Sequence, residues 1–174
     1  MDRYEQASRK HKETQEWLST PEGNKDFADM IVTSAFVAYG EKAEDAQKVM
    51  RSCGKALSMC HPQAVFHAFC EHAHNGIGTA MHLMEEAGEG DEFDRQTQAL
   101  HALKKTCEMM CKVCKATEYW NTKNVCKALA NVPDAVHKQR TMDEAFGSEN
   151  DGMYIGFNFL TGELLVKESS DENE

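Results

Sequence analysis

Apolar residues recur every three or four positions along most of this chain, a spacing typical of α-helices that bury one face. The spacing changes only once. From Met153 onward the apolar residues nearly alternate, a turn-like segment follows at 160–163, and a second apolar run begins at Leu164, which together predict a β-hairpin. Proline and glycine divide the helical part into predicted helices over residues 3–18, 25–39, 42–60, 62–87, 92–120 and 122–131, with a last helix from the break at 132–134 to Phe146.

These elements predict a mainly α fold, a multi-helix bundle of roughly five to seven helices with a C-terminal β-hairpin and a short acidic tail. An isolated hairpin is marginally stable in water, so we expect it to pack on the helices or to join another sheet. The expected divisions are a polar N-terminal helix or arm (1–20), the helical bundle core (21–147), the hairpin (148–167) and a disordered acidic tail (168–174).

The predicted core is rich in sulfur. Large aliphatic residues are scarce for 174 residues, but 10 methionines and 7 cysteines add apolar mass. Methionine fills irregular gaps and free cysteine behaves as a small hydrophobe, so these side chains can complete a core between helices.

The formal net charge is −10, and most of it falls after Met142. An acidic surface repels phosphate backbones, which disfavours direct nucleic-acid binding and favours a basic protein partner. Only the lysine-rich segment 101–127 reverses the sign.

No apolar stretch reaches the roughly 20 residues that cross a bilayer, and the first residues do not resemble an export signal. We therefore expect a cytoplasmic protein that does not enter membranes, with its cysteines kept as reduced thiols. Because 7 is an odd number, complete internal pairing is excluded in any case.

Cysteine and histidine residues gather at helical spacing on two predicted helices. If a metal binds, the best ligands are Cys70, His74, Cys111 and Cys114, a set of the kind that holds zinc in a tetrahedron. However, these cysteines also lie on the apolar stripes of their helices, which favours packing in the core. We therefore expect no cofactor, with zinc as the alternative.

Signs of catalysis are weak. The Cys-x-x-Cys at 111–114 lies in the middle of a helix, without the helix N-terminus that activates such thiols. A di-iron bundle needs two Glu-x-x-His motifs and two further glutamates on facing helices, and this chain has a single such motif. The chain has no nucleophile elbow, phosphate loop or dinucleotide fingerprint. His72 and His74, close to the helix-weakening Gly76 and Gly78, leave open a site for a small ligand or an enzyme reaction.

Small size, acidity and the lack of catalytic motifs favour a non-catalytic regulatory protein that acts by protein–protein interaction, such as an inhibitor or accessory factor of viral or mobile-element type. We also expect a homo-oligomer, because the hairpin edge and the thin core both gain from a partner. The candidate contact residues are Tyr4, Trp17 and Leu18 in the arm, and Tyr154, Phe157 and Phe159 in the hairpin.

Overall fold

The computed structural model describes residues 2–41, 43–88, 92–146 and 154–167. It confirms a mainly α bundle with a C-terminal hairpin. The 168–174 tail lies outside the described residues, as does the start of the predicted hairpin segment. The elements are α1 (Arg3–Leu18), α2 (Pro21–Gly40), α3 (Ala46–Leu57), α4 (Pro62–Ala87), α5 (Glu92–Thr117), α6 (Thr122–Phe146), β1 (Tyr154–Phe157) and β2 (Leu164–Lys167).

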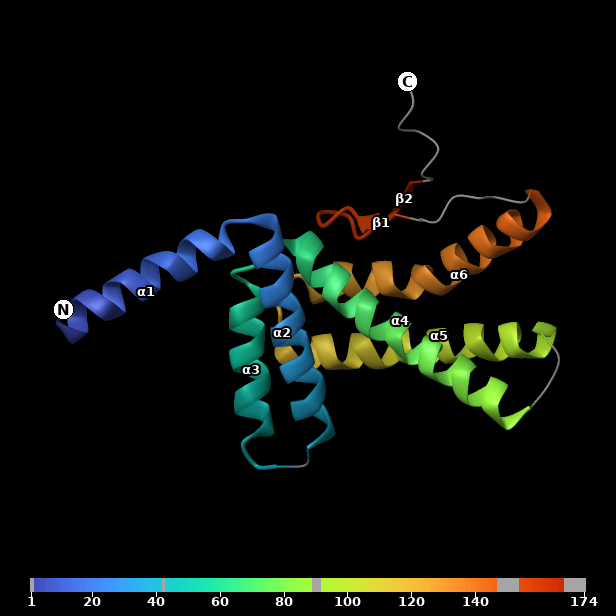
Figure 1. The fold of residues 1–174 in the computed structure, drawn as a ribbon, viewed down its shortest axis with the longest axis horizontal. Helices are drawn as coiled ribbons and strands as arrows, with labels where there is room; N and C mark the ends of the chain where they lie inside the picture. The colour runs from blue at the N-terminus through green and yellow to red at the C-terminus, as the bar shows by residue number, and fades with distance from the viewer. Residues whose placement is uncertain (1, 42, 89–91, 147–153, 168–174) are drawn as a thin grey trace, which may run out of the picture.

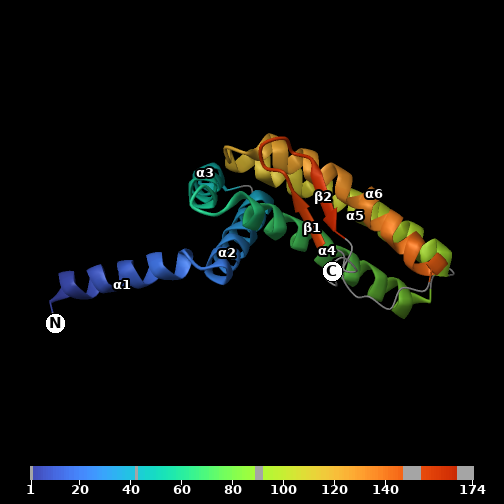
Figure 2. The same ribbon diagram turned by 90° about the horizontal axis from the view of Figure 1, so that it is seen from above.

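The helices form a body from which α1 projects as an arm (Figure 1). Within the body α2 runs beside α3 and also packs on α4, while α5 contacts both α4 and α6. Seen from above, α1 points away from all of these helices, and the hairpin lies over α4 and α6 (Figure 2). None of the residues of α1 is buried, so this helix is held to the body only at its C-terminal end.

The turn between α1 and α2 is fixed by side chains. Thr20 caps α2: its Oγ1 accepts the backbone N–H of Gly23 at 3.0 Å, and Pro21 occupies the first turn. Helix α2 therefore begins four residues before the predicted Lys25. Asn24 then ties the turn to α4, since its Nδ2 donates to the carbonyl of Leu18 at 3.0 Å and its Oδ1 accepts the N–H of His61 at 2.8 Å.

Helix α3 crosses the end of α5 at very short range. A Cβ on Gly54 would collide with the carbonyl oxygen of Thr117, so only glycine permits this approach. Helix α5 stops at Thr117 rather than at the predicted Trp120, because Glu118 has a φ of 57°, in the left-handed region. Arg51 of α3 reaches over this end and pairs with Glu118 at 3.4 Å.

Two segments with helix-weakening residues behave differently. Helix α4 runs without interruption through Gly76 and Gly78, as the residue range 62–87 predicts. The predicted break at 132–134 is wrong, because α6 is one helix with Pro133 inside it. The ring of Pro133 is buried beside Val132 and Val136, so packing offsets the hydrogen bond that a proline cannot donate.

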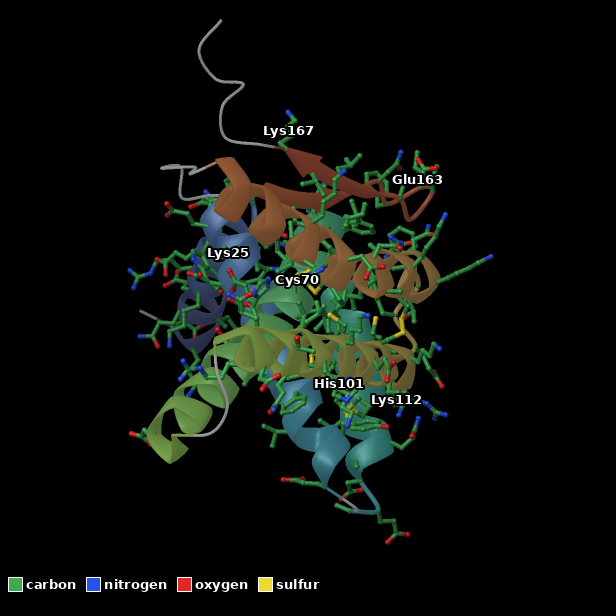
Figure 3. All side chains as sticks on the ribbon, turned by 90° about the vertical axis from the view of Figure 1, so that its right-hand side faces the viewer. Lys25, Cys70, His101, Lys112, Glu163 and Lys167 are labelled. Carbon is green, nitrogen blue, oxygen red and sulfur yellow. A yellow bond between two sulfur atoms is a disulfide. The ribbon has the colours of Figure 1, made fainter. Side chains whose placement is uncertain are left out.

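The core contains sulfur and small residues beside the larger aliphatic and aromatic ones, as composition indicates. Five of the seven cysteines are free and buried within it: Cys53, Cys60, Cys70, Cys107 and Cys114. Cys70 lies among the helices, well inside the side chains that cover them (Figure 3). The largest fully buried side chains include Phe66, Phe69, Leu57, Leu103 and Leu129.

The expectation that every cysteine is a reduced thiol is wrong. Cys111 of α5 and Cys126 of α6 form a disulfide, with their Cα atoms 5.2 Å apart. The two positions lie opposite each other because α5 and α6 form an antiparallel pair joined by a short turn. Spacing along each helix could not reveal this pair, because the contact depends on the register between the two helices.

The hairpin is antiparallel, with Tyr154 opposite Lys167 and Phe157 opposite Leu164. Gly162, with a φ of 73°, closes its turn against the backbone of Asn124, a conformation that side chains disfavour. The hairpin packs on the helices, one of the two arrangements expected for it. Asn124 Nδ2 donates to the carbonyl of Phe159 at 2.8 Å, and Lys127 Nζ donates to the carbonyl of Thr161 at 3.0 Å.

Candidate functional site

A pocket of about 730 Å³ opens where the α1–α2 turn meets the beginning of α4. Asn24 holds these segments together, as described above, and so keeps the pocket's shape. The pocket is lined by Ser19, Thr20, Pro21, Asn24, Lys25, His61, Gln63, Ala64, His67 and Glu71. Hydroxyl, amide, imidazole and charged groups therefore converge on one space, which is typical of a binding site for a small molecule.

Glu71, the one acid among the described residues that line this pocket, contacts a second carboxyl group, that of Asp29, which lies outside the lining. Glu71 of α4 forms an ion pair with Lys25 Nζ at 3.4 Å and is hydrogen-bonded to the carboxyl group of Asp29. Burial, followed by the charge of Glu71, raises the pKa of Asp29 above its ordinary value of 3.8. Asp29 therefore holds its proton more tightly than an exposed carboxyl group does.

Two histidines flank the carboxyl pair. Burial lowers the pKa of His67, which favours a neutral imidazole at the pocket wall. His72 Nε2 lies 3.0 Å from Thr33 Oγ1, whose own hydrogen is donated to the carbonyl of Asp29 at 2.8 Å. His72 must therefore donate this hydrogen bond from Nε2, which fixes its tautomer.

This arrangement can bind a ligand and share a proton with it, but no cysteine or capping hydroxyl beside it is set up as a nucleophile. The hydroxyl of Thr20 donates to the backbone carbonyl of Trp17 at 2.7 Å, and the hydroxyl of Ser19 donates to the backbone carbonyl of Glu16 at 2.6 Å. Glu71 is the acid of the lining that could attract a protonated amine, in competition with Lys25.

The sequence did not reveal this pocket, because its charged pair joins residues far apart in the chain. His72 was singled out and does lie beside the Asp29–Glu71 pair, on the same helix as Glu71. His74 is exposed, and the side chains of residues 76–85 lie outside the described part of the molecule. A contact between Asp29 and Glu71 follows only once α2 and α4 are packed together.

The proposed zinc ligands are arranged differently from the expectation. Cys111 is part of the disulfide and offers no thiolate, while Cys70 and Cys114 are buried in the core. Cys114 Sγ lies 3.4 Å from Thr122 Oγ1. Among the described residues, no three cysteine, histidine or acidic side chains are grouped as a metal site requires.

The expected contact residues divide between arm and hairpin. Tyr4 is 84% exposed and Trp17 is 43% exposed, whereas Leu18 is half-buried at the end of the arm. The assignment of Phe157 to the interaction surface is wrong, since it is only 2% exposed and stacks on Phe66 with ring centroids 4.7 Å apart.

Phe159 and Tyr154 are the other two hairpin positions that were predicted to contact a partner. Phe159 is half-buried against the ring of His61, and the side chain of Tyr154 lies outside the described residues. The exposed apolar residues of the hairpin are instead Leu160, Leu165 and Val166. Alternation in the sequence indicated a strand, but it did not tell which face would turn toward α4.

Comparison of the chain with protein-family models, with curated proteins and with solved structures found no match. In the part of the chain that the structure describes, no helix combines the length and the apolar character needed to cross a bilayer.

Proposed function

We propose that this chain is a non-catalytic regulatory protein that acts by binding another protein, with α1 as its main contact element. The observation that carries the proposal is the state of α1, a 16-residue helix without one buried residue. Isolated helices of this length are marginal in water, so a partner that covers Tyr4 and Trp17 would stabilise α1. Such a gain makes the arm a natural docking element.

Charge supports the choice of partner. The chain carries a net charge of −10, so a basic protein would be attracted at long range and oriented before contact. Aromatic side chains then supply the short-range binding energy, because tyrosine and tryptophan are the side chains most often found to dominate interfaces. An inhibitor or accessory factor works by this combination of steering and anchoring.

A matched pair of tryptophan variants tests the proposal. Trp17 lies in the arm, and Trp120 is exposed at the turn between α5 and α6. Affinity capture from the native cell, with the full chain as bait, should retain a specific protein that Trp17→Ala loses at least about tenfold, the range of a contact that anchors an interface. Trp120→Ala should retain it. Equal loss in both variants, or no specific partner, would contradict the proposal.

A second candidate function is the binding of a small amine in the pocket between the α1–α2 turn and α4, and the carboxyl group of Glu71 in its lining favours it. Titration calorimetry with spermidine tests it directly. We expect binding that Glu71→Gln abolishes and that Glu108→Gln, a change at an exposed acid on α5, leaves intact. Absence of heat with the unchanged protein would reject the amine as the ligand class.

A further inference from the structure

The two cysteines of the disulfide occupy a different environment from the other five. Cys111 and Cys126 are half-buried at the α5–α6 seam, so part of each residue is open to solvent. Their Cα atoms are 5.2 Å apart, within the normal range for a disulfide, and the helices need not move for the bond to form. This pair is therefore accessible and already in position.

The five free cysteines are shielded. All are buried, and burial raises the pKa of Cys60, Cys107 and Cys114 to about 11. The pKa of Cys53 and of Cys70 is raised for the same reason. Because the thiolate is the reactive form of cysteine, these five side chains remain unreactive thiols at neutral pH. The molecule thus separates a structural set of cysteines from one accessible pair.

The charged residues at helical spacing from the two cysteines are mostly basic. Lys115 is four residues after Cys111 on α5, and Lys123 is three residues before Cys126 on α6, spacings that place each lysine on the same face as the sulfur. Both lysines are exposed, and Lys112 lies at the outer edge of the same region (Figure 3). Glu108 is the acid at comparable spacing on α5, so positive charge is in excess.

We propose that Cys111 and Cys126 form a reversible dithiol–disulfide site that exchanges with a low-molecular-weight disulfide such as oxidised glutathione. One protein thiolate attacks a sulfur of oxidised glutathione, and one glutathione leaves as its thiolate. The second protein thiolate attacks the resulting mixed disulfide and releases the other glutathione. The protein pair loses two electrons, one oxidised glutathione becomes two reduced molecules, and the two protons of the protein thiols pass to them.

The site is connected to the hairpin through α6. Asn124 and Lys127, which donate hydrogen bonds to the hairpin carbonyls at Phe159 and Thr161, lie on either side of Cys126 in the chain. Locking Cys126 to α5 therefore fixes the segment that holds the hairpin turn. Opening the bond allows the first turns of α6 to move independently of α5, and the hairpin turn with them.

A glutathione titration of the full chain tests the site. Samples equilibrated over a range of reduced-to-oxidised ratios are quenched with acid, denatured and alkylated, and adducts are counted by intact mass. We expect one step from seven adducts to five, since two of the seven cysteines form the bond. No step at any ratio, or loss of a different pair, would overturn the proposal. This measurement on the unchanged protein needs no variant.

Two variants identify the residues. Cys126→Ser should abolish the two-electron step and leave Cys111 able to take up one glutathione. Cys53→Ser, a change at a buried free cysteine, should preserve the step with one adduct fewer throughout. A complete step that survives in Cys126→Ser would refute the assignment.

Hydrogen exchange at the Gly162 amide, which donates to Asn158 at 2.7 Å, should be faster in the reduced protein. Equal rates would refute the link to the hairpin.

Discussion

Asp29 shows how packing changes a side chain that looks ordinary in the sequence. In α2 it is one acid among several, but in the folded protein burial, followed by the charge of Glu71 on α4, raises its pKa above 3.8. A raised folded-state pKa means that the folded protein binds this proton more tightly than the unfolded chain. The stabilising effect is complete below about pH 4 and is lost as the pH rises through the folded-state value.

Replacing Asp29 by asparagine should therefore stabilise the protein at neutral pH. The amide removes the buried charge and can donate a hydrogen bond to Glu71, with a gain that we expect to stay below about 1 kcal/mol because the site is only partly buried. Urea unfolding at a series of pH values should show a smaller decline in stability above pH 4 for Asp29→Asn. Asp26→Asn, an exposed change on the same helix, should leave that slope as it is.

Gly54 is a position where a single residue determines how closely two helices approach. Gly54→Ala should lower the free energy of unfolding by about 1–3 kcal/mol, because its methyl group meets the carbonyl of Thr117 and forces α3 away from α5. Gly40 is the matched control, since nothing lies within 4 Å of its added methyl group. Denaturant titration compares the two, and equal stabilities for both variants would contradict the close crossing.

Residue-level properties were partly visible in the sequence. Burial of the five free cysteines followed from their places on apolar helix stripes, which is a local property. The Asp29–Glu71 contact and the Cys111–Cys126 bond depend on which helices are neighbours and on their register. Periodicity contains neither kind of information, so the polar pocket and the disulfide could not be predicted from it.

Elements were predicted well where one local signal dominates. The bounds of α1 and α4 agree with the expectation, because Pro62 and the turn around Gly88 mark the ends of α4. The prediction failed at Pro133, where a core contact outweighs the local preference of proline, and at the start of α2, where the cap is Thr20 rather than a residue nearer Lys25. Core packing decided the first case, whereas a local cap and a proline decided the second.

The disulfide joins α5 to α6 and should stabilise the folded protein. It closes a loop with a sequence separation of 15, for which loop-closure entropy predicts about 3 kcal/mol. Reduction should then lower the melting temperature by about 6–12 °C in a protein of this size. Calorimetry with and without reductant measures the change. A Cys111→Ala/Cys126→Ala protein should melt at the same temperature in both buffers, and a reductant effect there would point to another cause.

The hairpin contributes one large side chain to the core, and its loss should be costly. Phe157→Ala removes the ring that stacks on Phe66 and should destabilise the protein by about 3 kcal/mol. Leu165→Ala changes an exposed residue of the partner strand and should alter stability by less than about 0.5 kcal/mol. Thermal unfolding followed by circular dichroism separates the two. If Phe157→Ala melts like the unchanged protein, the hairpin is not seated on α4.

At the scale of the whole molecule, exposed apolar side chains and net charge oppose each other. Leu160 is 77% exposed, and Leu165 and Val166 lie with it on the hairpin, while a charge of −10 keeps copies of the chain apart. Salt screens the repulsion and leaves the apolar attraction. Association should therefore be stronger at high ionic strength.

Light scattering tests this expectation at protein concentrations on the order of tens of micromolar, where weak association becomes visible. We expect a mass above the 19.6 kDa of one chain, increasing with sodium chloride. Leu165→Lys should shift the population toward the monomer, and Met109→Lys, an exposed change on α5, should not. A constant monomer mass in every buffer would argue against self-association through the hairpin.

The seating of Phe157 on Phe66 also orders events during translation. The ribosome completes α4 long before it makes β1, since Gln63 and the Phe157 amide that bonds to it are 94 residues apart in the chain. A nascent chain therefore presents the ring of Phe66 without its cover while α5 and α6 are being made. Until β1 is made, α4 lacks the side chain that completes its cover in the folded protein.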